Sequence, residues 1–363
     1  MSKKETKQGG GVLGGFALLL LGIGLLWYNE GRTVANQSTI NEARKNYQDV
    51  KCEEIDSNNE GRLVATKGKI DLSEAAVLVD STFDISAKAA KLVRTVEVYQ
   101  WEESCTTDEN DNKTCTYEKK WHDGLIDSSG FSQSGHDNPT SLMYDSESFV
   151  ADNVKLGAFY LPEELIKSVS ADKKIGNNIL TEQYKNNVEG VVVVGNYLTN
   201  VSDNVPKIGD IRISYAYLDE ENVSVMAVQR GASFEAFTSK KGIDVYKILK
   251  GNYTGAQILE KMTKSNNNLK WILRAVGVLL LVGAFSSIFS IITNLTDKIP
   301  LLGKVVSGAT GLISGILGFA LSLIVIAIAW FRFRPILSIV LLAIVVALVV
   351  FLKYYLPKIK KDK

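Results

Sequence analysis

The chain has 363 residues and a net charge of +1, so it lacks the strong basic field of a nucleic-acid-binding protein. It contains three Cys and two His, which is too few for a zinc site built from protein ligands alone. Apolar residues are concentrated in residues 11–28 and 269–356, whereas residues 29–268 are polar and mixed. This division predicts a membrane protein that carries one large polar domain.

The first apolar segment, residues 11–28, follows a short Lys-rich start and is long enough to cross a bilayer as a helix. It ends in Trp27 and Tyr28, an aromatic pair typical of a membrane interface. A signal peptide would begin in a similar way, but no small-x-small cleavage site follows. We therefore predict an uncleaved transmembrane helix, with residues 1–10 as a cytosolic tail.

Residues 29–268 form the predicted extracytosolic or lumenal domain, which we expect to be rich in β-strands. It begins with a stalk helix at 33–50. Six strand-like runs follow, at 62–70, 92–101, 114–121, 188–198, 210–218 and 223–230. The last two are expected to pair as a hairpin through the turn at 219–222. Short helices are predicted at 162–169 and 255–263.

The order of these elements is repeated along the domain. A Glu-Gly pair, a hairpin, an extended segment and a short helix occur in residues 56–170 and again in residues 177–263. This repetition leads to the hypothesis of an internal duplication. The hypothesis requires the two halves to have the same strand order.

The cysteines all lie in the polar domain. Cys105 and Cys115 flank a polar segment at the tip of the hairpin formed by 92–101 and 114–121. Cysteines on adjacent strands can reach the spacing of a disulfide, and an oxidising compartment would permit one. We predict this bridge, with two free thiols as the alternative, and expect Cys52 to stay unpaired.

Side chains capable of catalysis are present but carry no ordering motif. His122 and His136 lie near Asp and Ser residues, from which a Ser/His/Asp set could be drawn, yet no nucleophile elbow is present. Ordinary polar loop residues are the favoured interpretation. We predict no catalytic, cofactor-binding or metal site and no enzymatic activity. Five Asn-x-Ser/Thr triplets would matter only in a eukaryotic secretory compartment, and they begin at Asn36, Asn112, Asn200, Asn222 and Asn252.

Three further transmembrane helices are predicted at 269–293, 305–331 and 336–356, followed by a cytosolic tail at 357–363. Trp271 lies at the entrance of the first of these, and Arg274 lies one turn inside. Because no acidic residue lies within the spans, we expect Arg274 to extend toward the lipid headgroups. Lysines in the short segments favour cytosolic positions for both termini.

Small residues recur at intervals of four in two spans. They are Gly11 and Gly15 in the first span and Ser307, Gly311 and Gly315 in the third, with Thr310, Ser314 and Gly318 one face over. Such rows let helix backbones approach closely, which predicts packing between spans of one chain. Self-association into a homo-oligomer through the same faces stays open. No span shows a polar stripe, so a pore is not expected.

Several motifs resemble the transmembrane protein 43 (LUMA) family in order and spacing. They are Asn29-Glu30-Gly31-Arg32, residues 59–64 (NEGRLV), 96–101 (VEVYQW), 135–139 (GHDNP), 209–212 (GDIR), 229–231 (QRG), 237–240 (FTSK) and Arg334-Pro335. The resemblance implies a four-span protein of the endoplasmic reticulum and inner nuclear membrane that organises protein complexes, with lamins and emerin among its partners. A bacterial relative would lie in the plasma membrane without those partners. The very short cytosolic start and the Cys-flanked hairpin tip depart from the family pattern.

The predicted fold class is therefore an α+β membrane protein with one N-terminal and three C-terminal transmembrane helices. The leading hypothesis is a scaffold that contacts the lipid bilayer and other membrane proteins but no nucleic acid. A lipid-binding or transport accessory protein would need an apolar cavity in the outer domain or an open groove between spans. At the interface, we expect Gly31 to turn the chain and Arg32 to meet lipid phosphate. Opposite charge at equal depth suggests a pair between Glu30 and Arg334.

Overall fold

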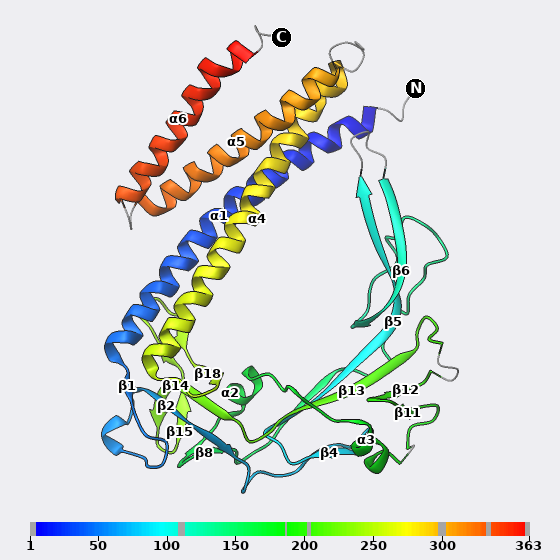
Figure 1. Ribbon diagram of the computed structural model, residues 1–363, viewed down its shortest axis with the longest axis vertical. Helices are drawn as coiled ribbons and strands as arrows, with labels where there is room; N and C mark the ends of the chain where they lie inside the picture. Colours follow the sequence, from blue (N-terminus) through cyan, green and yellow to red (C-terminus); the bar gives the residue numbers. More distant parts are fainter. Residues whose placement is uncertain are drawn as a thin grey trace. The chain divides into compact units, whose positions relative to one another are not determined.

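The computed structural model describes residues 5–107, 113–185, 187–201, 205–296, 303–331 and 335–359. The chain divides into two compact units. The helical unit comprises Met1–Lys45, Thr238–Ile243 and Leu259–Lys363, and the β unit comprises Asn46–Phe237 and Asp244–Ile258. Figure 1 shows the elements of both units coloured along the sequence.

Two long helices form the centre of the helical unit. α1 (Glu5–Asn46) and α4 (Gly255–Thr296) have 42 residues each, which gives each a length of roughly 63 Å. This is about twice the thickness of a hydrocarbon core. The first span and the predicted stalk helix are therefore one continuous helix, and the expected turn at Gly31 was wrong. α5 (Gly303–Phe331) and α6 (Pro335–Ile359) complete the unit.

Length and apolar composition make three helical segments of the described chain able to cross a membrane. They are Leu13–Asn46, Gly255–Phe289 and Gly311–Phe331. The apolar stretch described in α6 is shorter and comprises Ser338–Phe351. One N-terminal and two C-terminal apolar helices together with a β-rich region make this chain an α+β integral membrane protein.

α1 and α4 lie side by side in opposite directions (Figure 1), and small residues set their distance. A Cβ added to Gly277 of α4 would come within 2.5 Å of Leu26 of α1, and one added to Gly22 would come within 2.8 Å of Leu281. Leu26 and Leu281 also pack with Val325 and Ile326 of α5. The apolar contacts among these three helices therefore need glycine where the backbones meet.

The predicted glycine rows have mixed outcomes. Gly15 is closely packed, because a Cβ there would lie 2.9 Å from Ile288 and 3.1 Å from the carbonyl oxygen of Ala284. A Cβ on Gly311 or Gly315 would meet no atom of the described residues within 4 Å. The close approach in α5 is instead at Gly318, one face over, where an added Cβ would come within 2.7 Å of the backbone nitrogen of Val282. Nothing is described of the side-chain surroundings of Gly11 and Ser307.

The β unit contains two seven-stranded sheets. The first has the order β15-β14-β2-β8-β9, with β1 beside β2 and β18 beside β14. Its strands are β1 (Gln48–Asp49), β2 (Leu63–Asp71), β8 (Lys155–Leu156), β9 (Phe159–Tyr160), β14 (Asn222–Arg230), β15 (Ser233–Glu235) and β18 (Lys247–Lys250).

The second sheet has the order β11-β12-β13-β5-β6, with β10 beside β13 and β7 beside β5. Its strands are β5 (Lys91–Thr107), β6 (Lys113–Asp123), β7 (Glu147–Val150), β10 (Lys173–Lys174), β11 (Val192–Val194), β12 (Tyr197–Thr199) and β13 (Ile211–Leu218). The smaller elements are β3 (Leu78–Asp80), β4 (Ile85–Ala87), β16 (Phe237–Thr238), β17 (Asp244–Val245), α2 (Glu163–Ser168), α3 (Asn177–Gln183) and the 3₁₀ turn η1 (Ser57–Asn59).

The strands predicted at 62–70, 92–101, 114–121, 210–218 and 223–230 are confirmed as β2, β5, β6, β13 and β14. The prediction that β13 and β14 form a hairpin was wrong, because β13 pairs with β5 and β14 pairs with β2. Both strands carry enough apolar side chains to lie in the middle of a sheet, so the short turn between them leads from one sheet to the other. The two halves consequently differ in strand order, which contradicts the duplication as framed.

The single buried strand predicted at 188–198 was also wrong. The segment forms the short strands β11 and β12, which reverse at Gly195 with a positive φ of 57°. Val192 and Val194 are exposed. A run of valines predicts a strand but not its burial, which depends on what packs over it.

One hydrophobic core includes residues from both sheets, among them Leu92, Phe159, Tyr215 and Val225. A buried polar network lies in the same unit. Arg94 donates to Asp80 at 2.6 Å, and the hydroxyl of Tyr215 donates to the same carboxylate oxygen at 2.7 Å. Burial, and then the neighbouring Asp80, raise the pKa of Tyr215. The network fixes β3 against β5 and β13.

Candidate functional site

A buried ion pair in the helical unit joins α1, α4 and α5. Glu30 of α1 is 1% exposed, and Arg274 of α4 donates to its two carboxylate oxygens at 2.6 and 2.9 Å. The indole nitrogen of Trp330 in α5 donates to the same carboxylate. The expectation that Arg274 lacks an acidic partner and extends to the headgroups was therefore wrong. We call Glu30, Trp271, Arg274 and Trp330 the anchor layer.

Two aromatic rings complete the surroundings of Arg274. Its guanidinium lies 4.8 Å from the centre of the Trp271 ring and 5.0 Å from that of Trp330. Aromatic faces attract a cation, and an apolar setting strengthens that attraction. A carboxylate and a guanidinium that leave water together need such partners, because burial of either alone is costly.

A row of polar side chains lies one turn from the anchor layer. The amide of Asn29 donates to the carbonyl oxygen of Lys270 at 3.0 Å, and Arg32 donates to Asn266 at 3.2 Å. Asn266 in turn donates to the carbonyl oxygen of Thr33 at 3.1 Å. Arg32 is thus directed at α4 within the unit rather than at lipid phosphate as expected. These bonds hold α1 and α4 in register.

A groove of about 520 Å³ opens beside the anchor layer. Its walls come from α4, α5 and α6, and they include Trp271, Ala275, Val278, Phe319, Ile326 and Val340. Arg274 and Trp330 also line it, so the groove begins at the charged layer and continues between apolar surfaces. Its volume falls within the range of small-molecule sites, and its lining suits an apolar ligand.

The β5–β6 hairpin is the main projecting feature of the β unit (Figure 1). β13 pairs with β5 only between Lys91 and Val98, whereas β6 pairs with β5 as far as Thr107. The outer part of the hairpin therefore lies beyond the sheet. The structure joins Cys105 and Cys115 in a disulfide there, and leaves Cys52 buried with a free thiol.

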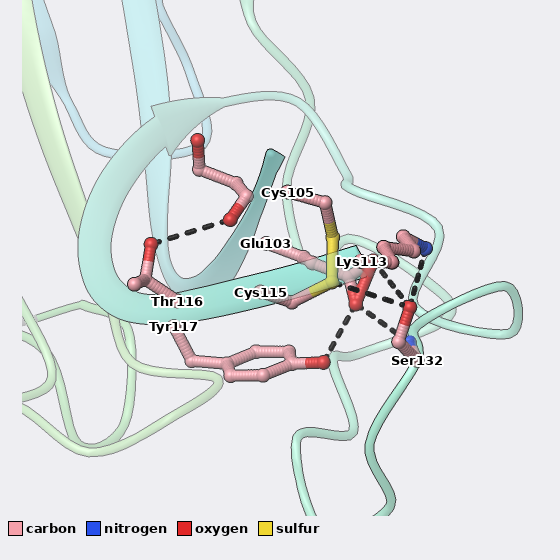
Figure 2. The surroundings of a disulfide bond; sticks show 8 residues. Glu103, Cys105, Lys113, Cys115, Thr116, Tyr117 and Ser132 are labelled. Atoms are coloured by element: carbon pink, nitrogen blue, oxygen red, sulfur yellow. Dashed lines mark hydrogen bonds between the residues drawn. A yellow bond between two sulfur atoms is a disulfide. The ribbon is translucent and has the colours of Figure 1, made fainter. Parts of the chain in front are cut away.

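Glu103 holds a loop against the outer hairpin. The hydroxyl of Tyr117 and the backbone N–H of Ser132 each donate to its carboxylate at 2.6 Å, as Figure 2 shows. The hydrogen bond from Tyr117, followed by that from Ser132, lowers the pKa of Glu103. Glu103, Cys105 and Cys115 are the one group of potential metal ligands that converges among the described residues. The sulfurs of Cys105 and Cys115 are joined in the disulfide, so neither cysteine offers a thiolate to a metal ion.

Asn138 and His136 of the same loop also contact the β5–β6 hairpin. The Asn138 amide bonds both the N–H and the carbonyl of Trp101, at 2.7 and 2.9 Å, and so imitates a neighbouring strand. His136 stacks on Tyr117 with ring centres 3.8 Å apart, and it makes a T-shaped contact with Trp101 with ring centres 4.5 Å apart. The imidazole thus lies in an aromatic stack, while Ser132 lies at Glu103. The Ser/His/Asp set considered from the sequence is not assembled from these residues.

The sequence model described as Transmembrane protein 43 matches residues 98–335 of this chain. The chain belongs to the transmembrane protein 43 family. It is 26% identical to Transmembrane protein 43 of Pongo abelii, over 99% of this chain and 94% of that protein. It is 28% identical to the Transmembrane protein 43 homolog of Drosophila melanogaster, over 90% of both chains, and 27% identical to the human protein, over 92% and 87%. No solved structure matches the chain.

Several motifs that carry the resemblance to the transmembrane protein 43 family make tertiary contacts, and some of these contacts join two motifs. Arg212 of GDIR binds Glu97 of VEVYQW through two bonds of 2.6 and 2.8 Å. The N–H of Gly231 in QRG donates to Glu60 of NEGRLV at 2.8 Å. In the helical unit, Ser239 of FTSK lies 2.8 Å from the hydroxyl of Thr39 in α1. The family motifs therefore mark tertiary contacts.

Two groups of predicted sites are described only in part by the structure. Arg334 lies outside the described residues, so the Glu30–Arg334 pair stays a hypothesis. Pro335 is the first residue of α6. Of the five Asn triplets, Asn112 is outside the described residues, while Asn36 bonds the carbonyl of Arg32 and Asn200 bonds the N–H of Ile211.

Sequence reasoning missed the joint site of Glu30, Arg274 and Trp330. An Arg one turn inside a span was a signal that a buried acid should be sought nearby.

Proposed function

We propose that this protein is a membrane-anchored, non-enzymatic scaffold with four transmembrane helices, in which α6 is the fourth. The β unit then lies on the extracytosolic or lumenal side and both termini are cytosolic, in line with the lysine distribution. The host decides the membrane: the endoplasmic reticulum or inner nuclear membrane in a eukaryote, and the plasma membrane in a bacterium.

The observation that carries the scaffold proposal is the projecting β5–β6 hairpin. β6 pairs with β5 along Lys113–Asp123 and forms the end of its sheet, and no other strand of the described residues pairs with it, which leaves its other edge as a place for a further strand. Partner proteins commonly add a strand to such an edge. The loop held by Glu103 and Asn138 braces the hairpin, and a braced element loses less conformational entropy on binding.

Proximity labelling with a tag on each side of the native membrane tests this role. We expect the β-unit tag to mark a reproducible set of membrane proteins. The set should shrink when residues 102–118 are replaced by an Asn-Gly turn. The matched control reverses the charge of Lys173 and Lys174, exposed residues of the short strand β10. Equal labelling by all three proteins, or by an unrelated four-span protein, would contradict the scaffold.

Lipid binding is a second candidate function, favoured by the groove between α4, α5 and α6. Such a protein should retain lipid through purification in mild detergent. Mass spectrometry of the intact protein tests this directly, because a specifically held lipid survives detergent exchange in a fixed ratio to protein, whereas bulk lipid is diluted away.

A further inference from the structure

A second pocket, of about 350 Å³, lies in the β unit, away from the sites described above. Its lining residues come from β1, from the segment between β1 and η1, from η1 and from β14. Asn59 begins the NEGRLV motif and Gln229 begins the QRG motif, so two of the family motifs meet at this pocket. We call it the β1 pocket.

The buried wall of the β1 pocket holds an acceptor without a donor. Gln229 is 1% exposed, and its Nε2 donates to the carbonyl oxygen of Asp56 at 2.8 Å. This bond fixes the orientation of the amide and so identifies Oε1 as its other end. No described residue donates a hydrogen bond to that Oε1. Because a buried carbonyl without a donor is unfavourable, this wall favours a ligand that brings an N–H or O–H group.

The exposed part of the lining is acidic. Asp49, Glu54 and Asp56 are exposed, and Lys51 is the one base among the described residues of the lining, which gives a formal charge balance of −2. Asp49 and Asp56 each accept a backbone N–H of the fold through Oδ1. Glu54 has no hydrogen-bond or ion-pair partner among the described residues. The pocket therefore favours a cation.

The arrangement of the acids favours an organic cation over a metal ion. The carboxylates of Asp49, Glu54 and Asp56 do not converge to within reach of a single ion, whereas a ligand on a flexible chain can pass them in turn. An ammonium group has three N–H donors and no acceptor, which fits an acidic entrance and a lone carbonyl. It is also a compact point charge, while the planar fork of a guanidinium matches paired carboxylate oxygens.

We propose that the β1 pocket binds a primary ammonium group on a flexible chain, which passes the carboxylates and donates to the Oε1 of Gln229. A polyamine and a lysine side chain of a partner protein share this chemistry. The site involves neither the β5–β6 hairpin nor the groove between α4, α5 and α6. Its failure would therefore leave both functions proposed above unaffected.

Isothermal titration calorimetry of the full chain in mild detergent tests the site. The probes are spermidine and the blocked peptide acetyl-Gly-Lys-Gly-amide, and the controls replace lysine in that peptide by norleucine or arginine. We expect one ammonium probe to bind per chain and the norleucine peptide not to bind. Tighter binding of spermidine assigns a polyamine, and tighter binding of the lysine peptide assigns a partner's side chain.

Two results of this titration would overturn the ammonium ligand. One is the absence of binding by both ammonium probes. The other is a preference of the pocket for a different cation, seen as tighter binding of the arginine peptide or as displacement of the bound probe by an equal concentration of Ca²⁺.

Variants of the lining locate the binding. Glu54→Gln should weaken binding about threefold, and Lys51→Gln, which removes the opposing charge, should tighten it about threefold. Glu189→Gln, the same change at an exposed residue outside the pocket, should have no effect. Gln229→Met should weaken binding about tenfold, with the fold checked by circular dichroism. If that variant does not fold, the opposite shifts at Glu54 and Lys51 decide, and equal affinities in those two variants would overturn the site.

Discussion

Among the described residues, the helical unit and the β unit each contain a buried ion pair, and the two pairs are built alike. In each, one carboxylate accepts hydrogen bonds from an arginine and an aromatic donor: Glu30 from Arg274 and Trp330, and Asp80 from Arg94 and Tyr215. Both arginines also lie near two aromatic rings, Phe83 and Phe149 for Arg94 and Trp271 and Trp330 for Arg274. The difference is one of charge, because Arg94 also binds a second carboxylate, Glu147, at 2.9 Å.

This difference follows from what surrounds each unit. Glu147 is half exposed, so water supports the extra charge that it brings to Arg94. Between apolar helices a second carboxylate would lack that support, and aromatic faces stabilise the cation without adding a charge. The Glu30–Arg274 pair therefore joins its helices through a single carboxylate. The same site opens into the apolar groove between α4, α5 and α6.

Removal of Asp80 should have the largest effect. Asp80→Asn leaves Arg94 and Tyr215 buried without the carboxylate, and we expect the free energy of unfolding to fall by about 3–5 kcal/mol. Denaturant unfolding of the full chain, followed by near-ultraviolet circular dichroism, measures this. The control is Glu147→Gln, which removes the half-exposed partner and should cost under about 1 kcal/mol. Equal losses would mean that burial does not distinguish the two carboxylates.

Glu30→Gln should destabilise the helical unit by about 1.5–3 kcal/mol, less than the loss at Asp80. Arg274 can still rest on its tryptophan rings or extend its flexible side chain toward headgroups. Thermal unfolding in lipid nanodiscs measures the change. Glu30→Arg should be more damaging, and Arg274→Glu in the same chain should restore part of the stability.

The Glu30→Arg variant also distinguishes between Arg274 and Arg334, the two proposed partners of Glu30. If Arg334→Glu rescues Glu30→Arg as well as Arg274→Glu does, Glu30 interacts with both arginines. If it gives no rescue, the Glu30–Arg334 hypothesis is wrong and the pair with Arg274 alone stands.

Cys105→Ser combined with Cys115→Ser should affect only the outer hairpin. That part lies beyond the sheet, so the main unfolding transition should move little, while protease cleavage near the tip should rise roughly tenfold. Mass spectrometry without reductant establishes the bridge in the natural chain. A large shift of the main transition would show that the hairpin is coupled to the core.

The smallest effect is expected from the titration of Glu103. Its pKa lies below the ordinary value of 4.5, so its carboxylate stabilises the folded state fully above pH 4.5. That stabilisation is lost as the pH falls through the lower, folded-state pKa. Amide exchange at Ser132, corrected for its intrinsic rate, should rise in this acidic window. Glu103→Gln should remove the pH dependence, and Glu118→Gln on the same hairpin should preserve it.

Much of the fold could be predicted from the sequence because it depends on local patterns. Long apolar runs predicted the helices, and alternation predicted β13, where Ile211, Ile213 and Tyr215 all face the core. The same alternation could not assign β13 and β14 to different sheets. The alternation of a strand indicates that one of its faces is buried, but it does not indicate which strand pairs with it.

The sequence by itself determined which segments are apolar helices, which alternate as strands and where the cysteines lie. Only the tertiary structure decided that Glu30 meets Arg274 and Trp330, 244 and 300 residues away along the chain. The physical reason is that periodicity reflects a residue's own turn or strand, whereas a buried charge is satisfied by whichever donors the packing of distant helices brings within hydrogen-bonding distance.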